Sequence, residues 1–271
     1  MAKKVLYLGG GKWCWTESCT KHAGIIKSKN AFVAATISND TIALEAAKTE
    51  LMSTPEGLST YRYLATQQLT KELGRRPTIG LDLDGTTGDF TSQLRTYMGT
   101  SLKIPQSEWA THFPNPDEYA MWTGTNPWYR DKDHFISSFQ AAEKEGLYRQ
   151  VPVYANASKV LHELRDYGFN IKVITARGAE FNDDTRYWTT THNIPIKKIL
   201  NPGMAKETVK DIDVYLDDAP HVINTLIQHE KKVVVMEHEY NEHTVPVHKN
   251  ARRTKEWNDN VVNAIFDLLK K

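Results

Sequence analysis

Apolar positions follow two different patterns along the chain, and the change falls near residue 77. Before it, a short apolar run at 5–8 precedes two segments with apolar residues at helical spacing. The second segment begins at Thr54-Pro55 and ends at Gly74. A hydroxyl residue before proline is typical of a helix start, and glycine of a helix end. The sequence therefore predicts a mostly helical N-terminal region.

From Thr78 onward, short apolar runs alternate with amphipathic stretches. The runs predict strands at 78–84, 170–175, 213–216 and 232–236, and the stretches predict helices at 157–168, 185–192, 222–227 and 257–269. Strands that alternate with helices are typical of a parallel sheet with right-handed crossovers. We therefore predict an α/β fold built on a parallel sheet.

A long segment interrupts this alternation between the first of these strands and the second. It is rich in aromatic residues, among them Trp109, Trp122 and Trp128, and is too long for a simple crossover. We expect an inserted subdomain placed over the sheet. The predicted domains are an N-terminal extension at 1–76, a core at 77–90 and 154–271, and a cap at 91–153.

Composition narrows the function classes. The 271 residues include 34 Lys and Arg against 33 Asp and Glu, with 40% hydrophobic and 25% charged residues, which is typical of a globular protein. A net charge of +1 gives no electrostatic basis for binding nucleic acid or a membrane. No apolar run approaches the roughly 18 residues that span a bilayer, and two cysteines make no disulfide framework. We expect a cytoplasmic protein without membrane or nucleic-acid partners.

Three of the predicted strands end in polar groups. Asp82 and Asp84 end the first strand, Thr175 ends the second, and Asp217-Asp218 end the third. Strand alternation puts Asp82 and Asp84 on one face, and ligands of open α/β sheets bind beyond the carboxyl ends of the strands. Carboxylates gathered there repel one another unless a cation lies between them, and an oxygen donor set favours Mg²⁺ over zinc. The sequence therefore predicts a magnesium site at the strand ends.

This series of motifs resembles that of the haloacid dehalogenase-like hydrolases over residues 78–269. The matching motifs are Asp82-Leu83-Asp84-Gly85-Thr86, Thr175, Lys206 and Asp217-Asp218. The resemblance implies a Rossmann-like parallel sheet with a small helical cap between the first and second motifs. It also implies phosphoryl transfer through an aspartyl-phosphate, with Mg²⁺ as cofactor.

The same resemblance implies a role for each motif residue. Asp82 is the nucleophile, Asp84 is the general acid and base, and Thr175 and Lys206 bind the phosphoryl oxygens. The metal is held by the Asp82 carboxylate, the Asp84 backbone carbonyl and Asp218, with Asp217 in support. Lys210 remains an alternative to Lys206, because the spacing from Lys206 to Asp217 is about one residue longer than the family pattern.

Further stretches are similar to the 5′(3′)-deoxyribonucleotidases, a subgroup of these hydrolases. They are the first motif with Asp89-Phe90, Gly146–Pro152, Asp184–Trp188, Glu239–His243 and Trp257. The similarity implies a nucleoside monophosphate substrate, such as dTMP or dUMP, and aromatic side chains around its base. By position Phe90 is the first candidate for this contact, and Trp109, Phe113, Trp122 and Trp128 are further candidates. The chain has Ala176 where the family often has serine, so its phosphate contacts can be distributed differently.

Three alternatives remain open from the sequence. The chain could be a nucleic-acid 3′-phosphatase, another small-molecule phosphatase of the same superfamily, or a binding or assembly protein with a vestigial enzyme domain. Residues 1–76 could form a homo-oligomer contact or a docking element. Cys14, Cys19 and His22 supply three of the four ligands of a structural zinc site, but no fourth ligand is apparent, so buried or incidental thiols are the favoured interpretation.

Overall fold

The computed structural model of the chain describes residues 6–9, 12–15 and 20–270. Its strands are β1 (Leu6–Gly9), β2 (Lys12–Cys14), β3 (Thr78–Leu81), β4 (Asn170–Ile174), β5 (Lys198–Leu200), β6 (Val214–Asp217), β7 (Val233–Met236) and β8 (Ala251–Thr254). Its α-helices are α1 (Ala23–Ser38), α2 (Thr41–Leu51), α3 (Pro55–Leu73), α4 (Phe90–Ser101), α5 (Trp109–His112), α6 (Lys132–Lys144), α7 (Leu147–Gln150), α8 (Ala157–Tyr167), α9 (Asn182–Thr191), α10 (Pro220–Gln228), α11 (Glu239–Glu242) and α12 (Asp259–Leu269). Short 3₁₀ turns are η1 (Thr20–His22), η2 (Gln106–Glu108), η3 (Ala179–Phe181) and η4 (Lys206–Thr208).

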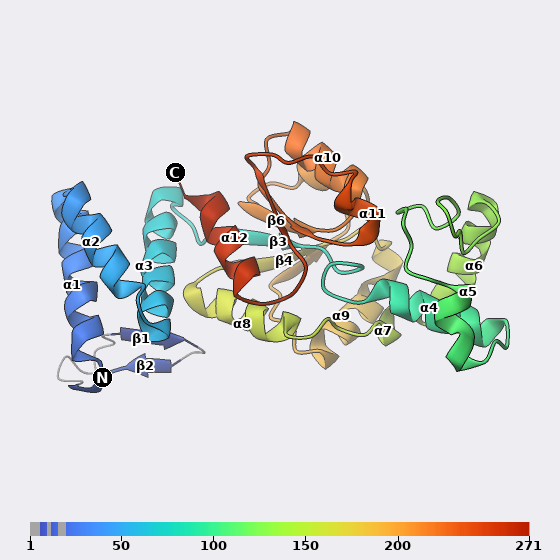
Figure 1. Ribbon diagram of the computed structural model, residues 1–271, viewed down its shortest axis with the longest axis horizontal. Helices are drawn as coiled ribbons and strands as arrows, with labels where there is room; N and C mark the ends of the chain where they lie inside the picture. Colours follow the sequence, from blue (N-terminus) through green and yellow to red (C-terminus); the bar gives the residue numbers. More distant parts are fainter. Residues whose placement is uncertain (1–5, 10–11, 16–19, 271) are drawn as a thin grey trace. The chain divides into compact units, whose positions relative to one another are not determined.

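The chain divides into two compact units (Figure 1). We call them the helical unit, which runs to Pro77 and includes His162–Asn170, and the sheet unit, which is formed by the remaining residues. None of the helices within the described ranges is both long and apolar enough to cross a membrane.

The predicted helical N-terminal region is confirmed. α3 begins as the sequence indicated, because the Thr54 side chain accepts a hydrogen bond from the Gly57 amide at 3.1 Å and Pro55 is the first helical residue. It ends at Gly74, whose φ of +65° is left-handed. Cys14 is buried on β2, whereas Cys19 lies outside the described residues, so the zinc hypothesis stays a prediction.

Residues of α8 also belong to the helical unit, which the sequence did not predict. Arg62 on α3 donates a hydrogen bond to Glu163 at 3.5 Å. The ring of Tyr167 lies 5.6 Å from that of Tyr7, edge to face. The helical unit therefore takes part of its packing from a segment far along the chain.

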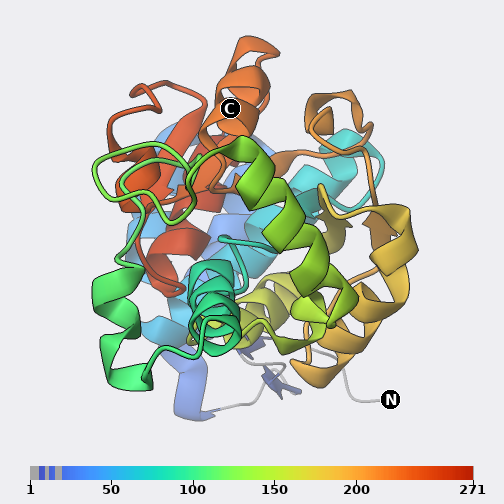
Figure 2. The same ribbon diagram turned by 90° about the vertical axis from the view of Figure 1, so that its right-hand side faces the viewer.

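The sheet unit contains a six-stranded sheet in the order β5-β4-β3-β6-β7-β8. The pairs β4–β5, β3–β6, β6–β7 and β7–β8 are parallel, and α9 and α10 lie on opposite sides of the sheet (Figures 1 and 2). The predicted α/β fold is confirmed. β5 and β8 were missed because they are short edge strands with partly exposed residues, so they lack the apolar run that marks a buried strand.

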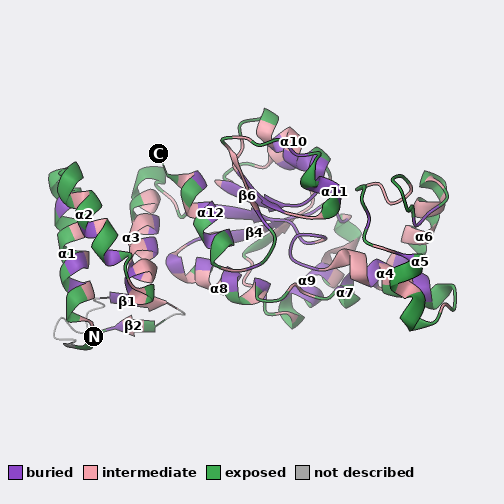
Figure 3. Ribbon diagram, in the orientation of Figure 1, coloured by how far each residue is buried: buried purple, intermediate pink, exposed green. Residues whose placement is uncertain are grey.

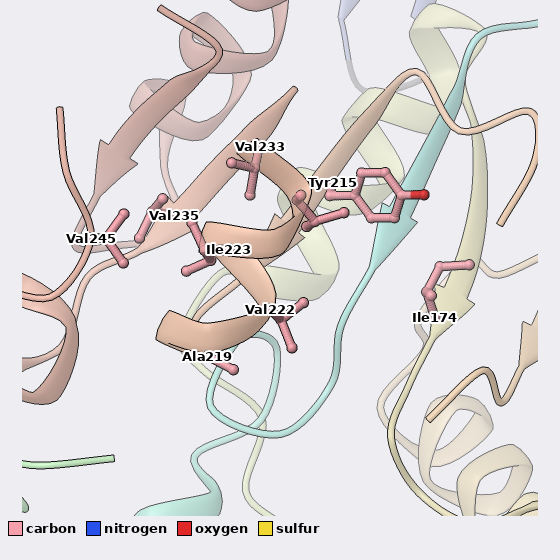
Figure 4. Packing of buried hydrophobic residues seen from close by; sticks show 9 residues of the cluster. Ile174, Tyr215, Ala219, Val222, Ile223, Val233, Val235 and Val245 are labelled. Atoms are coloured by element: carbon pink, nitrogen blue, oxygen red, sulfur yellow. The ribbon is translucent and has the colours of Figure 1, made fainter. Parts of the chain in front are cut away.

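The core of the sheet unit lies around its central strands. Every residue of β3, β6 and β7 is buried (Figure 3). Val222 and Ile223 on α10 belong to one apolar cluster with Val233 and Val235 on β7 (Figure 4). Burying an apolar side chain of this size contributes roughly 1.5–3 kcal/mol to the free energy of folding. This packing therefore stabilises the strands whose ends carry the polar residues.

An insertion of helices α4 to α7 joins β3 to α8 and lies in front of the sheet in Figure 2. It has its own apolar cluster, formed by Leu94, Met98, Phe113, Trp128 and Tyr129. Two of its helices are capped by aspartates, since Asp89 accepts from the Ser92 amide and Asp131 from the His134 amide.

Candidate active site

Asp82, Asp217 and Asp218 form a buried acidic cluster, in which one carboxylate oxygen of each residue lies within 4.8 Å of the others. Asp82 directly follows β3, and Asp217 and Asp218 stand at the end of β6. β3 and β6 are adjacent and parallel, with Leu81 paired to Leu216. Because parallel strands end at the same edge, the sheet itself brings these carboxylates together.

Lys206 lies within this acidic cluster. Its ammonium group donates hydrogen bonds to Oδ1 of Asp82 at 2.6 Å and to Oδ2 of Asp217 at 2.7 Å. Burial opposes the charged form, but the two carboxylates outweigh it and raise the pKa of Lys206, so the ammonium group stays charged. Lys210, the alternative from the sequence, is exposed. The structure thus places Lys206, rather than Lys210, beside Asp82.

The cluster carries more negative charge than Lys206 offsets. Burial raises the pKa of Asp82 well above its usual range against the opposing effect of Lys206, and the Asp217 carboxylate adds to the rise. Burial and Asp217 likewise raise the pKa of Asp218 from 3.8 to about 6. When ionised, the three carboxylates carry three negative charges, and Lys206 compensates only one of them. All the ligand atoms that the carboxylates offer are oxygens. These residues therefore fit a hard divalent cation.

Hydrogen bonds from neighbouring residues fix the orientation of the Asp218 carboxylate. Its Oδ1 accepts from the Thr86 hydroxyl at 2.6 Å, and its Oδ2 accepts from the Tyr240 phenol at 2.7 Å. Gly85 has a φ of +82°, and a Cβ atom there would lie 2.3 Å from Oδ2 of Asp218. Only glycine permits this close approach of the β3 turn to the carboxylate.

Asp84 forms an ion pair that the sequence did not predict. Arg177 donates from Nη2 to Oδ1 of Asp84 at 2.5 Å and from Nε to Oδ2 at 2.8 Å. The guanidinium carbon of Arg177 lies 4.2 Å from the ring centre of Tyr148. The side chain of Asp84 is 24% exposed, whereas that of Arg177 is 1% exposed. The only sequence signal was the position of Arg177, two residues after Thr175 at a strand end.

Thr175 follows β4, which is the neighbour of β3 on the side opposite to β6. The residue is 1% exposed, and its hydroxyl accepts a hydrogen bond from the Arg177 amide at 3.2 Å. Thr175 therefore stands at the same sheet edge as the acidic cluster.

A cavity of about 370 Å³ opens over these strand ends. The core contributes Asp82, Asp84, Thr175, Lys206 and Asp218 to its lining. Its volume lies within the range of small-molecule sites. All the proposed catalytic side chains therefore line one cavity that can hold a ligand.

The insertion supplies aromatic walls to this cavity. Of the five aromatic residues predicted to contact a base, the structure brings Phe90 and Trp122 to the lining but not Trp109, Phe113 and Trp128. Trp109 packs over Gly99 of α4, and Trp128 belongs to the apolar cluster of the insertion. Their indole N–H groups donate to backbone carbonyls at 2.9 and 2.7 Å, so both side chains serve the internal packing of the insertion.

Sequence reasoning gave no role to several lining residues. They are Tyr119, Met121, Phe135, Phe139, Glu143, Tyr148, Arg177, Met204 and Tyr240. Phe135, Phe139 and Glu143 recur at four-residue intervals, which is the one signal that could have placed them on a common helix face.

A family model described as "5' nucleotidase, deoxy (Pyrimidine), cytosolic type C protein" matches residues 76–267. The chain belongs to this family. The expected membership of the haloacid dehalogenase-like hydrolases, and the expected activity of a phosphomonoester hydrolase of the 5′-nucleotidase kind, are thereby confirmed.

Two curated proteins and one solved structure illustrate what else the chain is similar to. A Chlorobaculum tepidum protein provisionally named 5'(3')-deoxyribonucleotidase is 26% identical over 200 residues, which cover 71% of this chain and 89% of that protein. A provisionally named nucleotidase of Oceanobacillus iheyensis is 25% identical over 129 residues, which cover 45% of this chain and 66% of that protein. The magnesium-bound hydrolase YfnB of Bacillus subtilis aligns with a TM-score of 0.46 at 13% identity, covering 70% of this chain and 98% of that one.

Proposed function

We propose that the chain hydrolyses deoxyribonucleoside 5′-monophosphates in the presence of Mg²⁺ and releases inorganic phosphate. The observation that carries this proposal is the cavity in which Asp82, Lys206 and Asp218 of the core face a lining that includes Phe90 and Trp122. The charged side suits a phosphoryl group, and aromatic side chains suit a nucleobase. The family description and the name of the Chlorobaculum relative agree with a nucleotide substrate.

The first chemical step transfers the phosphoryl group to the protein. A carboxylate oxygen of Asp82 forms a bond to phosphorus while the bond from phosphorus to the 5′ oxygen breaks. Asp84 donates a proton to the departing oxygen, so the nucleoside leaves as an alcohol. Lys206 and Thr175 hold the phosphoryl oxygens, where the negative charge of the transition state resides.

The second step returns the protein to its starting state. Asp84 takes a proton from water, the water oxygen bonds to phosphorus, and the bond from phosphorus to Asp82 breaks. Both oxygens of Asp84 accept from Arg177 in the structure. This arrangement suits the ionised carboxylate that remains after proton delivery, which is the form that takes the proton from water in this step.

The same proposal includes a metal ion and assigns separate roles to the core and the cap. The Asp82 and Asp218 carboxylates and the Asp84 backbone carbonyl, with Asp217 in support, would hold Mg²⁺, which would offset the repulsion between carboxylate and phosphate. The core at 77–90 and 154–271 carries the chemistry, and the cap at 91–153 encloses the nucleoside. A cytoplasmic location, expected from the sequence, agrees with the family description.

A panel of phosphate esters tests the proposed activity. The purified chain with MgCl₂ is expected to release phosphate from deoxyribonucleoside 5′-monophosphates, and a DNA oligomer with a 3′-phosphate is expected to stay intact. If the nucleotide panel stays intact while the oligomer or another phosphoester is cleaved, the substrate assignment is wrong.

Stability measured against pH tests the metal site. Because the folded-state pKa of Asp218 is raised to about 6, the folded chain binds this proton more tightly than the unfolded chain does. Without metal, this residue's contribution is therefore expected to fall as pH rises from about 4 to 6, and to be lost above that window. A bound cation favours the ionised carboxylates, so MgCl₂ is expected to raise the melting temperature more at pH 7.5 than at pH 5.

Thermal unfolding with EDTA or MgCl₂ at the two pH values measures this effect. The variant Asp218→Asn is expected to lose the magnesium-dependent rise, whereas Asp183→Asn, a change at a side chain that is 89% exposed, is expected to keep it. An equal response of both variants to MgCl₂ would argue against metal binding at this cluster.

A further inference from the structure

Glu143 is a carboxylate in the cavity lining that the proposed chemistry does not use. It lies on α6 together with Phe135 and Phe139, and the three residues recur at four-residue intervals on one helix face. The rings of Phe135 and Phe139 are stacked, with centres 5.5 Å apart and planes 20° apart. Glu143 therefore extends an aromatic wall with a single charged acceptor.

Tyr148 fixes the orientation of this carboxylate. Its phenol donates a hydrogen bond to Oε1 of Glu143 at 2.7 Å. Burial and then the Asp84 carboxylate raise the pKa of Tyr148, so the phenol keeps its proton. The Arg177 guanidinium lies over the same ring, with its carbon 4.2 Å from the ring centre. A carboxylate has room for several donors, and Glu143 therefore retains the capacity to accept from a ligand.

Charge decides which part of a nucleotide meets Glu143. A phosphoryl group is repelled by this carboxylate and is attracted to the ammonium group of Lys206, which lies beside Asp82. Phe135 and Phe139 line the same cavity as Asp82, so the neutral remainder of a nucleotide whose phosphoryl group is at Asp82 has this aromatic wall to pack against. The polar edge of a base is the part that offers N–H donors to an acceptor at this wall.

We propose that Glu143 accepts a hydrogen bond from the exocyclic amino group of the nucleobase, an inference that rests on the proposed function. Cytosine, adenine and guanine carry such an amino group, and carboxylates accept from the amino group of cytosine in known base recognition. Uracil and thymine carry a carbonyl oxygen in its place, which is repelled by the carboxylate, so the neighbouring N3–H is the one donor that they offer at this edge. The preferred substrates therefore differ from the dTMP and dUMP expected from the sequence.

dCMP and dUMP give the sharpest test, because cytosine has an amino group at position 4 beside an unprotonated N3, whereas uracil has a carbonyl group there beside an N3–H group. The wild-type chain with MgCl₂ is expected to show a kcat/KM for dCMP about tenfold above that for dUMP. In the variant Glu143→Gln, the amide can donate to the uracil carbonyl, so the ratio is expected to fall to about one or below.

The matched control is Glu145→Gln, which changes an exposed glutamate near the end of the same helix and is expected to keep the wild-type ratio. The inference is overturned if the wild-type chain has the same kcat/KM for dUMP as for dCMP. It is also overturned if Glu143→Gln changes kcat/KM for all nucleotides by the same factor. A variant that alters only the preference between CMP and dCMP would likewise overturn it, because that result indicates a sugar contact. Failure to cleave any nucleotide would instead refute the proposed function, and this inference with it.

Discussion

Replacing Asp82 with asparagine is expected to lower phosphate release from nucleotides by about 10⁴-fold or more, because an amide cannot serve as the nucleophile. The fold is expected to remain intact. Burial already raises the pKa of Asp82 well above its usual range, so its ionised form opposes folding when no metal is present. Without Mg²⁺, the variant is therefore expected to melt at or above the wild-type temperature.

The matched control is Asp183→Asn, which changes a side chain that is 89% exposed and is expected to keep full activity. Initial rates with MgCl₂ and melting curves with EDTA measure the two effects separately. A folded Asp82→Asn variant that retained more than a few per cent of wild-type activity would contradict the role of Asp82.

Replacing Lys206 with methionine is expected to produce the largest loss of stability. Methionine has a similar length but no charge, so the carboxylates of Asp82 and Asp217 lose the ammonium group that lies 2.6 and 2.7 Å away. Removing one partner from a buried ion pair costs about 3–5 kcal/mol. The free energy of unfolding, measured by urea denaturation in EDTA, is expected to fall by that amount, and activity is expected to fall with it.

Lys210→Met is the matched control, because Lys210 is exposed and such changes usually stay within about 0.5 kcal/mol. MgCl₂ is expected to narrow the gap between Lys206→Met and wild type, since a cation replaces part of the missing positive charge. Equal stability of the two lysine variants would show that Lys206 does not hold the carboxylates together.

The residues at the strand ends could be predicted because few physical rules determine their place. β3, β4 and β6 consist mainly of buried apolar residues, so each run of such residues marked a strand. Parallel strands end at a common edge, and the polar residues that follow them must gather there. Their gathering at this edge does not depend on how the helices pack.

The cavity wall could not be predicted in the same way. Trp109, Trp122 and Trp128 are alike in sequence, yet only Trp122 reaches the cavity. Which indole turns inward depends on the packing of α4, α5 and the loops between them, and that packing is tertiary. The pairing of Asp84 with Arg177 has the same origin, because it joins the ends of two separate strands.

The helical unit shows a further limit. The hydrogen bond from Arg62 on α3 to Glu163 on α8 joins two residues that are far apart in sequence. Both residues belong to helices with ordinary polar faces. Hydrophobic periodicity reports which face of a helix is buried, but it does not report which partner covers that face.

Chemical trapping of the phosphorylated protein tests directly whether Asp82 is the nucleophile. The chain would be mixed with nucleotide and MgCl₂, quenched in acid within one turnover, reduced with borohydride and digested for mass spectrometry, with Asp82→Asn treated in parallel. We expect the reduced product of an acyl phosphate at position 82 in the wild-type chain alone. Rapid hydrolysis of the nucleotide with no modification at Asp82 would contradict it.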